Sequence, residues 1–250
     1  QAAEFLQNQG LEKGDASPIG FLAKGNPEPL LQTPGVRVQD QGSQLIALAL
    51  LEIGNHDGRW LDMCSGPGGK SAVLQAGISG GKGELDCLEP AEHRAELVRK
   101  ALNPKLPGRV IVDYGQAAEP DSYDAVLLDA PCSGLGSLRR KPESRWRKQP
   151  EQLGQLTKIQ AELLDAGIAA LKPGGYLLYS TCTPVVPETN TQIKSALQKH
   201  SDVELIDAAE VINKINPNLK LNSNRKTVQL WTHLHGTDAM FLAILRKKLG

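Results

Sequence analysis

The sequence predicts an α/β fold built on a doubly wound, mostly parallel sheet. Short apolar segments alternate with longer segments of helical periodicity through the middle of the chain, which is typical of successive right-handed βαβ units. The 250 residues are enough for one large domain with a small appendage. Of these residues, 40% are apolar and 22% are charged, as in ordinary globular domains.

The charge balance and the apolar runs exclude several classes of protein. The 28 basic and 28 acidic residues give a net charge of zero, so neither a strongly basic nucleic-acid arm nor an acidic disordered tail describes the whole chain, although a local patch is allowed. The longest apolar run covers residues 45–51 and is too short to span a membrane, and no signal peptide is visible. The chain begins at Gln1 rather than Met, as expected for a fragment of a longer protein.

The predicted elements follow in order along the chain. Residues 1–35 are dense in glycine and proline, which indicates an irregular lead-in with one or two short elements. Ser43 is expected to cap a first helix over the apolar residues 45–50, so we assign an N-terminal extension to residues 1–42 and the main domain to residues 43–250. Short apolar segments predict strands at residues 59–63, 84–88, 109–112, 125–128 and 176–180. Helices are predicted at residues 70–75, 91–102, 153–171 and 188–200, the third ending before Pro173, Gly174 and Gly175. Two last strands, 227–233 and 239–245, are expected to form an antiparallel hairpin at a sheet edge.

A glycine-rich turn follows the first predicted strand, at the edge where such sheets bind ligands. Residues 64–70 read Cys-Ser-Gly-Pro-Gly-Gly-Lys, and glycines let a ligand approach the backbone beside the free N–H groups of a helix start. Cys64 stands where a Walker phosphate loop has its first glycine, and the G-x-G-x-x-G dinucleotide pattern is absent. Glu89 follows twenty residues after Gly69, where an acid can accept hydrogen bonds from both ribose hydroxyls. An adenosine cofactor without a pyrophosphate, S-adenosylmethionine, is therefore favoured over NAD.

Two of the four cysteines follow predicted strand ends. Cys132 comes three residues after Asp129, at the end of the fourth strand, and Cys182 follows the fifth strand. A thiol at such an edge can ionise and attack an electrophile, so both cysteines are candidate catalytic groups. Cys87 lies within a strand and is expected to be a buried hydrophobic residue. No pair of cysteines has the spacing of a zinc site, so we expect reduced thiols and no metal.

These motifs together resemble those of the RNA 5-methylcytosine methyltransferases, most closely the bacterial enzymes of small-subunit ribosomal RNA. The similar segments are residues 38–44, 62–71, 129–136, 180–183 and 236–243, which span almost the whole chain. The resemblance implies a Rossmann-like class I methyltransferase fold and methyl transfer from S-adenosylmethionine to C5 of a cytosine in ribosomal RNA. It implies the following cofactor-binding residues: Cys64, Ser65, Gly66, Pro67, Gly68, Gly69, Lys70, Glu89, Arg94, Asp113 and Asp129.

The resemblance also gives each catalytic residue a role. Cys182 would add to C6 of the cytosine and make C5 nucleophilic, and Cys132 would help to release the product; spacing alone does not tell which thiol attacks. Asp129, as a neutral acid against N3, would offset the charge that develops on the ring, and burial would raise its pKa. The sequence departs from the family in two places. Many relatives have alanines where this chain has Ser65 and Gly66, and an aspartate where it has Glu89, whose extra methylene changes the ribose geometry.

A basic segment follows Cys132. Residues 139–148 hold six positive residues and one negative residue, a net charge of +5 in a neutral chain. Such a run can be a solvated face, but arginine and tryptophan also bind phosphates and stack on bases. We therefore predict RNA contact by Arg139, Arg140, Lys141, Arg145, Trp146, Arg147 and Lys148. The target cytosine must leave its stack, so a single-stranded, loop or flipped-out base is expected. His233 and His235 would point the same way on a strand and are expected to be a surface pair rather than metal ligands.

Two other functions remain open at this point. A non-catalytic RNA-binding ribosome assembly factor could keep the same fold, although the intact Cys182, Cys132 and Asp129 argue against it. An amino-methyltransferase would place an aromatic residue where Cys132 stands. We expect a cytoplasmic protein without membrane partners, and neither the target nucleotide nor the oligomeric state follows from the sequence. Full-length bacterial relatives carry a helical RNA-binding domain upstream, which fits the expectation of a fragment.

Overall fold

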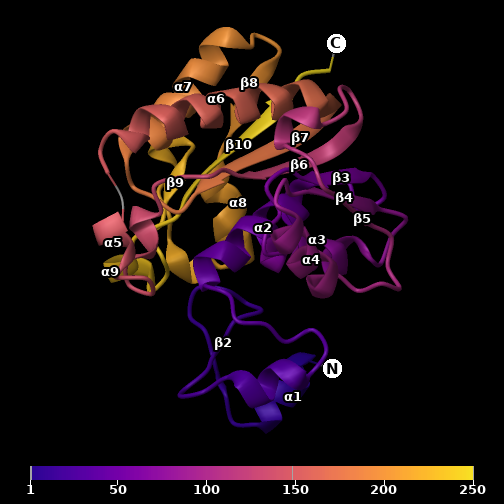
Figure 1. Cartoon of the computed structure of the whole chain (residues 1–250), viewed down its shortest axis with the longest axis vertical. Helices are drawn as coiled ribbons and strands as arrows, with labels where there is room; N and C mark the ends of the chain where they lie inside the picture. Colours follow the sequence, from indigo (N-terminus) through magenta and orange to yellow (C-terminus); the bar gives the residue numbers. More distant parts are fainter. Residues whose placement is uncertain (1, 148, 250) are drawn as a thin grey trace.

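The computed structural model describes residues 2–147 and 149–249 and contains one large twisted sheet with helices on both faces (Figure 1). The strands of this sheet are β3 (Arg59–Asp62), β4 (Glu84–Leu88), β5 (Arg109–Ile111), β6 (Tyr123–Asp129), β7 (Leu171–Thr181), β8 (Val203–Ile206), β9 (Val228–Gln229) and β10 (Phe241–Lys247). Their order is β5-β4-β3-β6-β7-β10-β8, with β9 beside β10. Neighbours from β5 to β7 pair in parallel, and β10 runs antiparallel to β7, β8 and β9. The order reverses between β3 and β6, where doubly wound sheets bind ligands, so the predicted fold class is confirmed.

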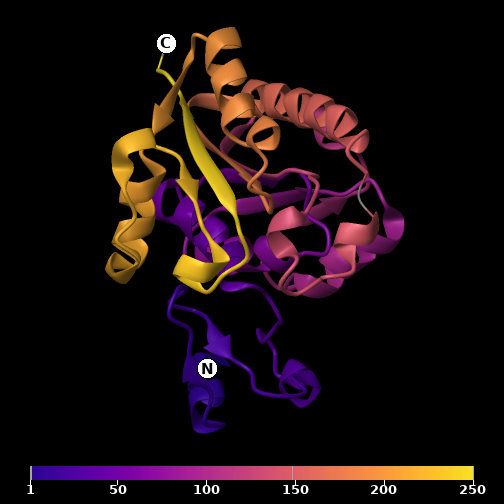
Figure 2. The same ribbon diagram turned by 90° about the vertical axis from the view of Figure 1, so that its left-hand side faces the viewer.

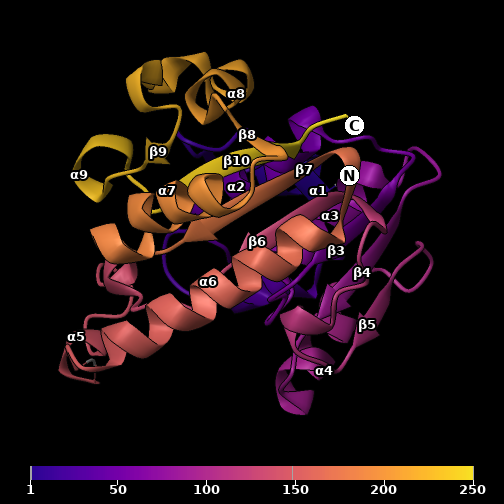
Figure 3. The ribbon, with the colours of Figure 1, turned by 90° about the horizontal axis from the view of Figure 1, so that it is seen from above.

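Successive residues of the strands face opposite sides and fill two separate cores. On β3, Trp60 packs into one core and Leu61 into the other. The first core is covered by α2 (Gln41–Ile53), α3 (Gly69–Ile78), α4 (Glu92–Ala101) and α8 (Ala208–Ile215). The second core is covered by α6 (Gln152–Ala170) and α7 (Asn190–Lys199). Figure 1 places these two helices above the sheet and the first group below it, and Figure 3 shows α6 and α7 side by side. Continuous apolar strands therefore reflect burial on both faces, as predicted.

Residues 2–40 form a small lobe beneath the sheet (Figures 1 and 2). It contains α1 (Ala2–Asn8), the antiparallel pair β1 (Glu12–Lys13) and β2 (Phe21–Leu22), and the 3-10 turn η1 (Glu28–Gln32). The Gln41 side chain accepts hydrogen bonds from the N–H groups of Ala16 and Ser17, at 2.9 and 3.0 Å, and so ties the lobe to the start of α2. The lead-in is irregular, as expected, but among the described residues 2–40 it holds four short elements rather than one or two. The division into residues 1–42 and 43–250 stays a proposal.

Short helical turns make up the rest of the described elements. They are α5 (Ser144–Arg147), α9 (Thr232–His235), η2 (Gly115–Ala117), η3 (Leu135–Ser137), η4 (Val186–Glu188), η5 (Pro217–Leu219) and η6 (Ser223–Arg225). Within residues 2–147 and 149–249, no helix combines the length and the apolar character that crossing a membrane requires.

Several predicted boundaries were wrong. Asp40, rather than Ser43, caps α2, because its Oδ1 accepts from the Gly42 N–H at 2.9 Å. The predicted stop at residues 173–175 lies inside β7 instead, at an irregularity in its register with β6, and α6 ends earlier at Ala170. Residues 227–233 contain only the two-residue strand β9 before the chain turns into α9. β9 does pair with β10, but β10 lies between β7 and β8 rather than at the edge.

Candidate active site at the carboxyl edge of the sheet

The register of β6 and β7 brings the two candidate thiols together. Asp129 pairs with Ser180 across the parallel strands, so both chains leave the sheet at the same level. Cys132 and Cys182 then meet with their Sγ atoms 3.4 Å apart. The Gly136 N–H donates to the Cys182 carbonyl at 2.9 Å, and a Cβ at Gly136 would lie only 2.8 Å from that oxygen. The two loops are therefore packed backbone to backbone.

The two thiols differ in acidity. The hydrogen bond with Cys132 lowers the pKa of Cys182, and the charge of Lys70 acts in the same direction, against burial and the charge of Asp129. The same hydrogen bond, together with burial, raises the pKa of Cys132. Cys182 is thus the thiol that ionises more readily, with a protonated neighbour beside it.

Asp129 is held from two directions. Its Oδ2 accepts from the Lys70 ammonium at 2.6 Å, and its Oδ1 accepts from the Ser180 hydroxyl at 2.8 Å. Burial acts to lower the pKa of Lys70, but Asp129 outweighs it and the net shift is upward. Lys70 stands in the first turn of α3, so this ion pair joins the glycine loop to the sheet edge that carries the two thiols. Both Asp129 oxygens accept hydrogen bonds here, so this structure does not show the neutral form that donates a hydrogen bond. That form stays a prediction.

The glycine loop packs against the end of β4. The Gly66 N–H donates to Glu89 Oε2 at 3.2 Å, and Arg94 Nη2 donates to the Gly66 carbonyl at 2.7 Å. Arg94 Nε lies 3.5 Å from the same Glu89 oxygen. A Cβ at Gly66 would lie 2.2 Å from Glu89 Oε2, so this approach requires glycine. Gly68, at the start of α3, has a left-handed φ of 95°, which also favours glycine.

A buried acceptor lies beside this loop. Asp62, the last residue of β3, accepts from the Ser71 hydroxyl through Oδ2 at 2.7 Å, but its buried Oδ1 has no hydrogen-bond partner among the described residues. Burial raises the pKa of Asp62 to about 6 and also raises that of Cys64. Unpartnered buried acceptors are rare and suit a ligand that brings a donor. The sequence-based reasoning gave Asp62 no role.

Asp113 also follows a strand of this edge, β5. Its Oδ1 accepts from the Tyr114 N–H at 2.7 Å, and in the part of the chain that the structure describes it makes no hydrogen bond to the glycine loop. Its predicted place near an adenine stays a prediction.

The basic segment is exposed, but only its first two arginines are anchored by ion pairs among the described residues. Arg139 donates to Asp40 Oδ2 at 2.9 Å, and Arg140 donates to Asp238 through Nε at 2.9 Å. The exposed part includes Lys141, and Trp146 is 74% exposed with the Arg145 guanidinium 4.7 Å from its ring centre. For Arg147 only the backbone is described, and Lys148 lies outside the described residues.

The histidine pair lies on a helix rather than on a strand. His233 and His235 belong to α9, and His235 Nδ1 accepts from the Trp231 N–H at 2.8 Å. Among residues 2–147 and 149–249, no group of three or more His, Cys, Asp or Glu side chains has the arrangement of a metal site. Cys87 is fully buried, as predicted.

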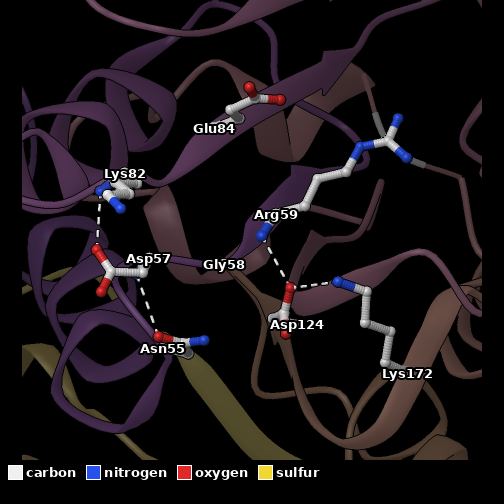
Figure 4. A pocket seen from close by; sticks show the side chains of 8 residues that line it. All are labelled: Asn55, Asp57, Gly58, Arg59, Lys82, Glu84, Asp124 and Lys172. Atoms are coloured by element: carbon white, nitrogen blue, oxygen red, sulfur yellow. Dashed lines mark hydrogen bonds and ion pairs between the residues drawn. The ribbon is translucent and has the colours of Figure 1, made fainter.

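Two cavities lie away from the cysteines. One, of about 430 Å³, opens at the amino edge of the sheet, where Figure 4 shows Asp124 between the Arg59 backbone and Lys172. Its lining carries charges of both signs, and Lys172 pairs with Asp124 at 2.7 Å, so it offers no single-sign ligand site. The other, of about 870 Å³, lies between the N-terminal lobe and α2 and α3.

One buried residue of the site was missed entirely. Glu188 was expected only to begin a helix, yet its carboxylate accepts from Ser133 and Gln160, which lie 55 and 28 residues away in the sequence. No local pattern could have indicated these contacts.

The strand order, the glycine loop after β3 and the acid after β4 define a Rossmann-like methyltransferase fold. The crystal structure of a methyltransferase homologue protein from Pyrococcus horikoshii shares this fold, with a TM-score of 0.76 and 22% identity, covering 99% of this chain and 83% of that chain. A sequence model of the family described as 16S rRNA methyltransferase RsmB/F matches residues 48–246, and the chain belongs to this family. The family expected from the motifs is thereby confirmed.

Two curated relatives agree with this assignment. The chain is 43% identical over 247 residues to "Putative methyltransferase" of Mycobacterium tuberculosis (strain CDC 1551 / Oshkosh), covering 94% of this chain and 51% of the relative. It is 34% identical over 260 residues to "Probable ribosomal RNA small subunit methyltransferase B" of Bacillus subtilis (strain 168), covering 99% of this chain and 56% of the relative. The chain therefore spans about half the length of these relatives.

Proposed function

We propose that this chain carries the catalytic site of a cytoplasmic, S-adenosylmethionine-dependent methyltransferase that modifies C5 of a cytosine in ribosomal RNA. The observation that carries the proposal is the pair of thiols 3.4 Å apart at the carboxyl edge of the sheet, with Asp129 beside them. The substrate class is supported by the family description, which names 16S rRNA, and by the name of the Bacillus subtilis relative.

The glycine loop fits the proposed cofactor on three counts. Gly66 leaves no room for a side chain, and Asp62 Oδ1 is a buried acceptor without a donor among the described residues. Glu89 receives three contacts, from Gly66 N, Ala91 N and Arg94 Nε, and a carboxylate has about four acceptor positions, so one is left for a ribose hydroxyl. We assign cofactor binding to residues 64–70, Glu89, Arg94, Asp113 and Asp129. When bound, S-adenosylmethionine supplies an electrophilic methyl group.

Cys182 is the proposed nucleophile. Its thiolate sulfur forms a bond to C6 of the cytosine, which turns C5 into an enamine-like carbon able to accept the methyl group. A base then takes the C5 proton, the C6–S bond breaks, and the electron pair returns to the Cys182 sulfur; Cys132 assists this release. Asp129, as the neutral acid, donates to N3 and offsets the negative charge that develops on the ring. The lowered pKa of Cys182 supports this assignment of roles.

The RNA contact is assigned to residues 139–148. Arginine and lysine neutralise phosphates, and an exposed indole such as Trp146 stacks on an unpaired base. Because a thiol cannot reach C6 inside a helical stack, the substrate is a single-stranded, loop or flipped-out cytosine.

The test is a Cys132→Ala variant incubated with S-adenosylmethionine and unmodified small-subunit ribosomal RNA. We expect a covalent protein–RNA adduct on a denaturing gel, because addition at C6 still occurs while release is slowed. The adduct disappears when Cys182→Ala is added. Cys87→Ala is the matched control, since this buried thiol lies outside the site and its loss should leave turnover intact.

Two outcomes favour the other functions. If the folded wild-type chain produces no 5-methylcytosine, a non-catalytic assembly factor is favoured. If Cys182→Ala keeps methyl transfer, the enzyme methylates another position, as an amino-methyltransferase does.

A further inference from the structure

A buried carboxylate lies behind the loop that carries Cys132. Glu188 ends the turn η4, just before α7, and is fully buried. The reaction proposed above makes no use of it. A buried carboxylate is costly unless donors surround it, so its partners indicate what it holds in place.

The donors lie on both sides of Cys132. Ser133 donates its N–H to Glu188 Oε1 at 2.7 Å and its hydroxyl to Oε2 at 2.5 Å. Gln160, on α6, donates to Glu188 Oε1 at 3.1 Å and to the Pro131 carbonyl at 2.9 Å. Glu188 is thus attached to the residue after Cys132 directly and to the residue before it through Gln160.

Two more contacts complete the cluster. The Tyr179 hydroxyl donates to the Glu188 carbonyl at 2.8 Å and fixes the backbone of η4 against β7. Ser133 Oγ lies 2.9 Å from Thr183 Oγ1, and Thr183 directly follows Cys182. The residues that follow both cysteines are therefore joined in one buried hydrogen-bond network, which rigidifies what it connects.

We propose that Glu188 is a positioning residue that fixes the backbone around Cys132 and so keeps the Cys132 sulfur within hydrogen-bond reach of the Cys182 sulfur. The inference rests on the proposed function only where turnover is concerned, because the relation between the two thiols can be measured without RNA. In the proposed reaction, a displaced Cys132 no longer assists release, so the RNA stays attached to Cys182.

The test replaces Glu188 with two residues of similar size. Glu188→Met keeps the volume and removes both acceptors, whereas Glu188→Gln keeps an amide oxygen for the Ser133 N–H and an amide nitrogen that donates to the Ser133 hydroxyl. The readout is the pH midpoint of Cys182 alkylation by iodoacetamide, assigned by peptide mass spectrometry. Glu188→Met moves the midpoint upward, toward that of Cys132→Ala, and Glu188→Gln restores it. A role in packing alone would make the two variants behave alike.

For the alkylation midpoint to report on the contact between Cys132 and Cys182, the other charged groups around Cys182 must stay in place in the Glu188 variants. Lys70, Asp129, Asp238 and Arg140 also face Cys182, and within the described residues none of them is hydrogen-bonded to Glu188. The control is Asp86→Asn, which alters another buried carboxylate that accepts from three side chains but lies on β4, away from the cysteines. This variant loses stability and keeps the alkylation midpoint.

With RNA and S-adenosylmethionine, Glu188→Met lowers kcat by about 100-fold with KM for RNA unchanged, and the covalent adduct accumulates as it does in Cys132→Ala. If the wild-type chain makes no 5-methylcytosine, the proposed function fails and the alkylation result still decides the role of Glu188. A folded Glu188→Met protein with the wild-type midpoint overturns the inference. Should this variant not fold, Ser133→Ala, which removes one donor and keeps the N–H, must move the midpoint in the same direction by less; no movement overturns the inference too.

Discussion

Gly66 and Glu89 form a matched pair, and a double-mutant cycle on them tests the structure of the glycine loop. The resemblance to the family led us to expect an alanine and an aspartate at these positions; compared with that pair, this chain has one carbon less in the loop and one more in the acid. A Cβ at Gly66 would lie 2.2 Å from Glu89 Oε2, whereas ordinary contacts begin at 3.4 Å, and the acid would have to retreat by about 1.2 Å, which is the difference between these two distances. Glu89 is 2% exposed and has no solvent to retreat into.

The size of the effect follows from this geometry. Gly66→Ala overpacks the loop, which costs about 1–3 kcal/mol, and breaks the Gly66 N–H to Glu89 hydrogen bond, which adds about 0.5–1.5 kcal/mol. Glu89→Asp alone withdraws the carboxylate from the loop and leaves a methylene-sized gap, at a cost of about 1 kcal/mol. In the double variant the new methyl group fills that gap. The two changes should therefore be coupled by about 1–3 kcal/mol, with the double variant more stable than the sum predicts.

The assay is urea unfolding of the four proteins of the cycle, with calorimetric titration of S-adenosylhomocysteine as a second readout. The control is Gly80→Ala, because a Cβ at this exposed turn meets no atom within 4 Å, and its effect should stay within about 0.5 kcal/mol. Additivity of the two single changes to within about 0.5 kcal/mol would refute the contact between Gly66 and Glu89.

Three further predictions concern charged residues. Lys70→Gln removes a positive charge that favours the Cys182 thiolate, so the pH midpoint of Cys182 alkylation must rise. The control is Lys82→Gln, which changes an exposed lysine. An equal midpoint in both variants would contradict the influence of Lys70 on Cys182. Arg140→Gln removes the nearer of the two arginines that face the buried Asp238, and only Arg139 remains, at 3.6 Å. The free energy of unfolding should fall by about 1–2 kcal/mol, less than for a fully buried pair, because Arg140 is 42% exposed and Arg139 stays in place. Lys141→Gln should leave stability unchanged in urea unfolding and weaken RNA binding, measured by fluorescence anisotropy at two salt concentrations, with a salt slope smaller by about 1. Equal losses of stability in Arg140→Gln and Lys141→Gln would contradict the distinction between the ion-paired arginines and Lys141.

The sheet could be predicted because its signals are local. Strands buried on both faces are short apolar runs, and their alternation with helices fixes the order in which chain ends reach the carboxyl edge. The start of α2 could not be predicted, because Asp40 and Ser43 are both good caps. The choice falls on Asp40 since its carboxylate also contacts Arg139 and the Asp238 N–H, which lie 99 and 198 residues away.

The same distinction applies to the candidate site. Cys132, Cys182 and Asp129 were placed correctly at one edge because each follows a strand, and topology alone carries them there. Arg139 and Arg140 look identical to their basic neighbours in the sequence, and only their distant carboxylate partners separate them. A charge run shows how much charge a segment carries, but it does not show which residues the fold has already paired.

These pairs explain how the loop that carries Cys132 is held in place. Arg139 and Arg140 anchor the chain that leaves Cys132 to the start of α2 and to the segment before β10. Gly136 lies between the Cys182 and Ala239 backbones; its N–H donates to the Cys182 carbonyl and its carbonyl accepts from the Ala239 N–H, each at 2.9 Å. The loop is thereby fixed at its far end, as Glu188 fixes it at its near end. Beyond this anchor, Lys141 and Arg145 form no ion pair in the part of the chain that the structure describes. A reaction that needs two sulfurs within a fraction of an ångström of their working positions gains from such preorganisation, because the geometry is set before the substrate arrives.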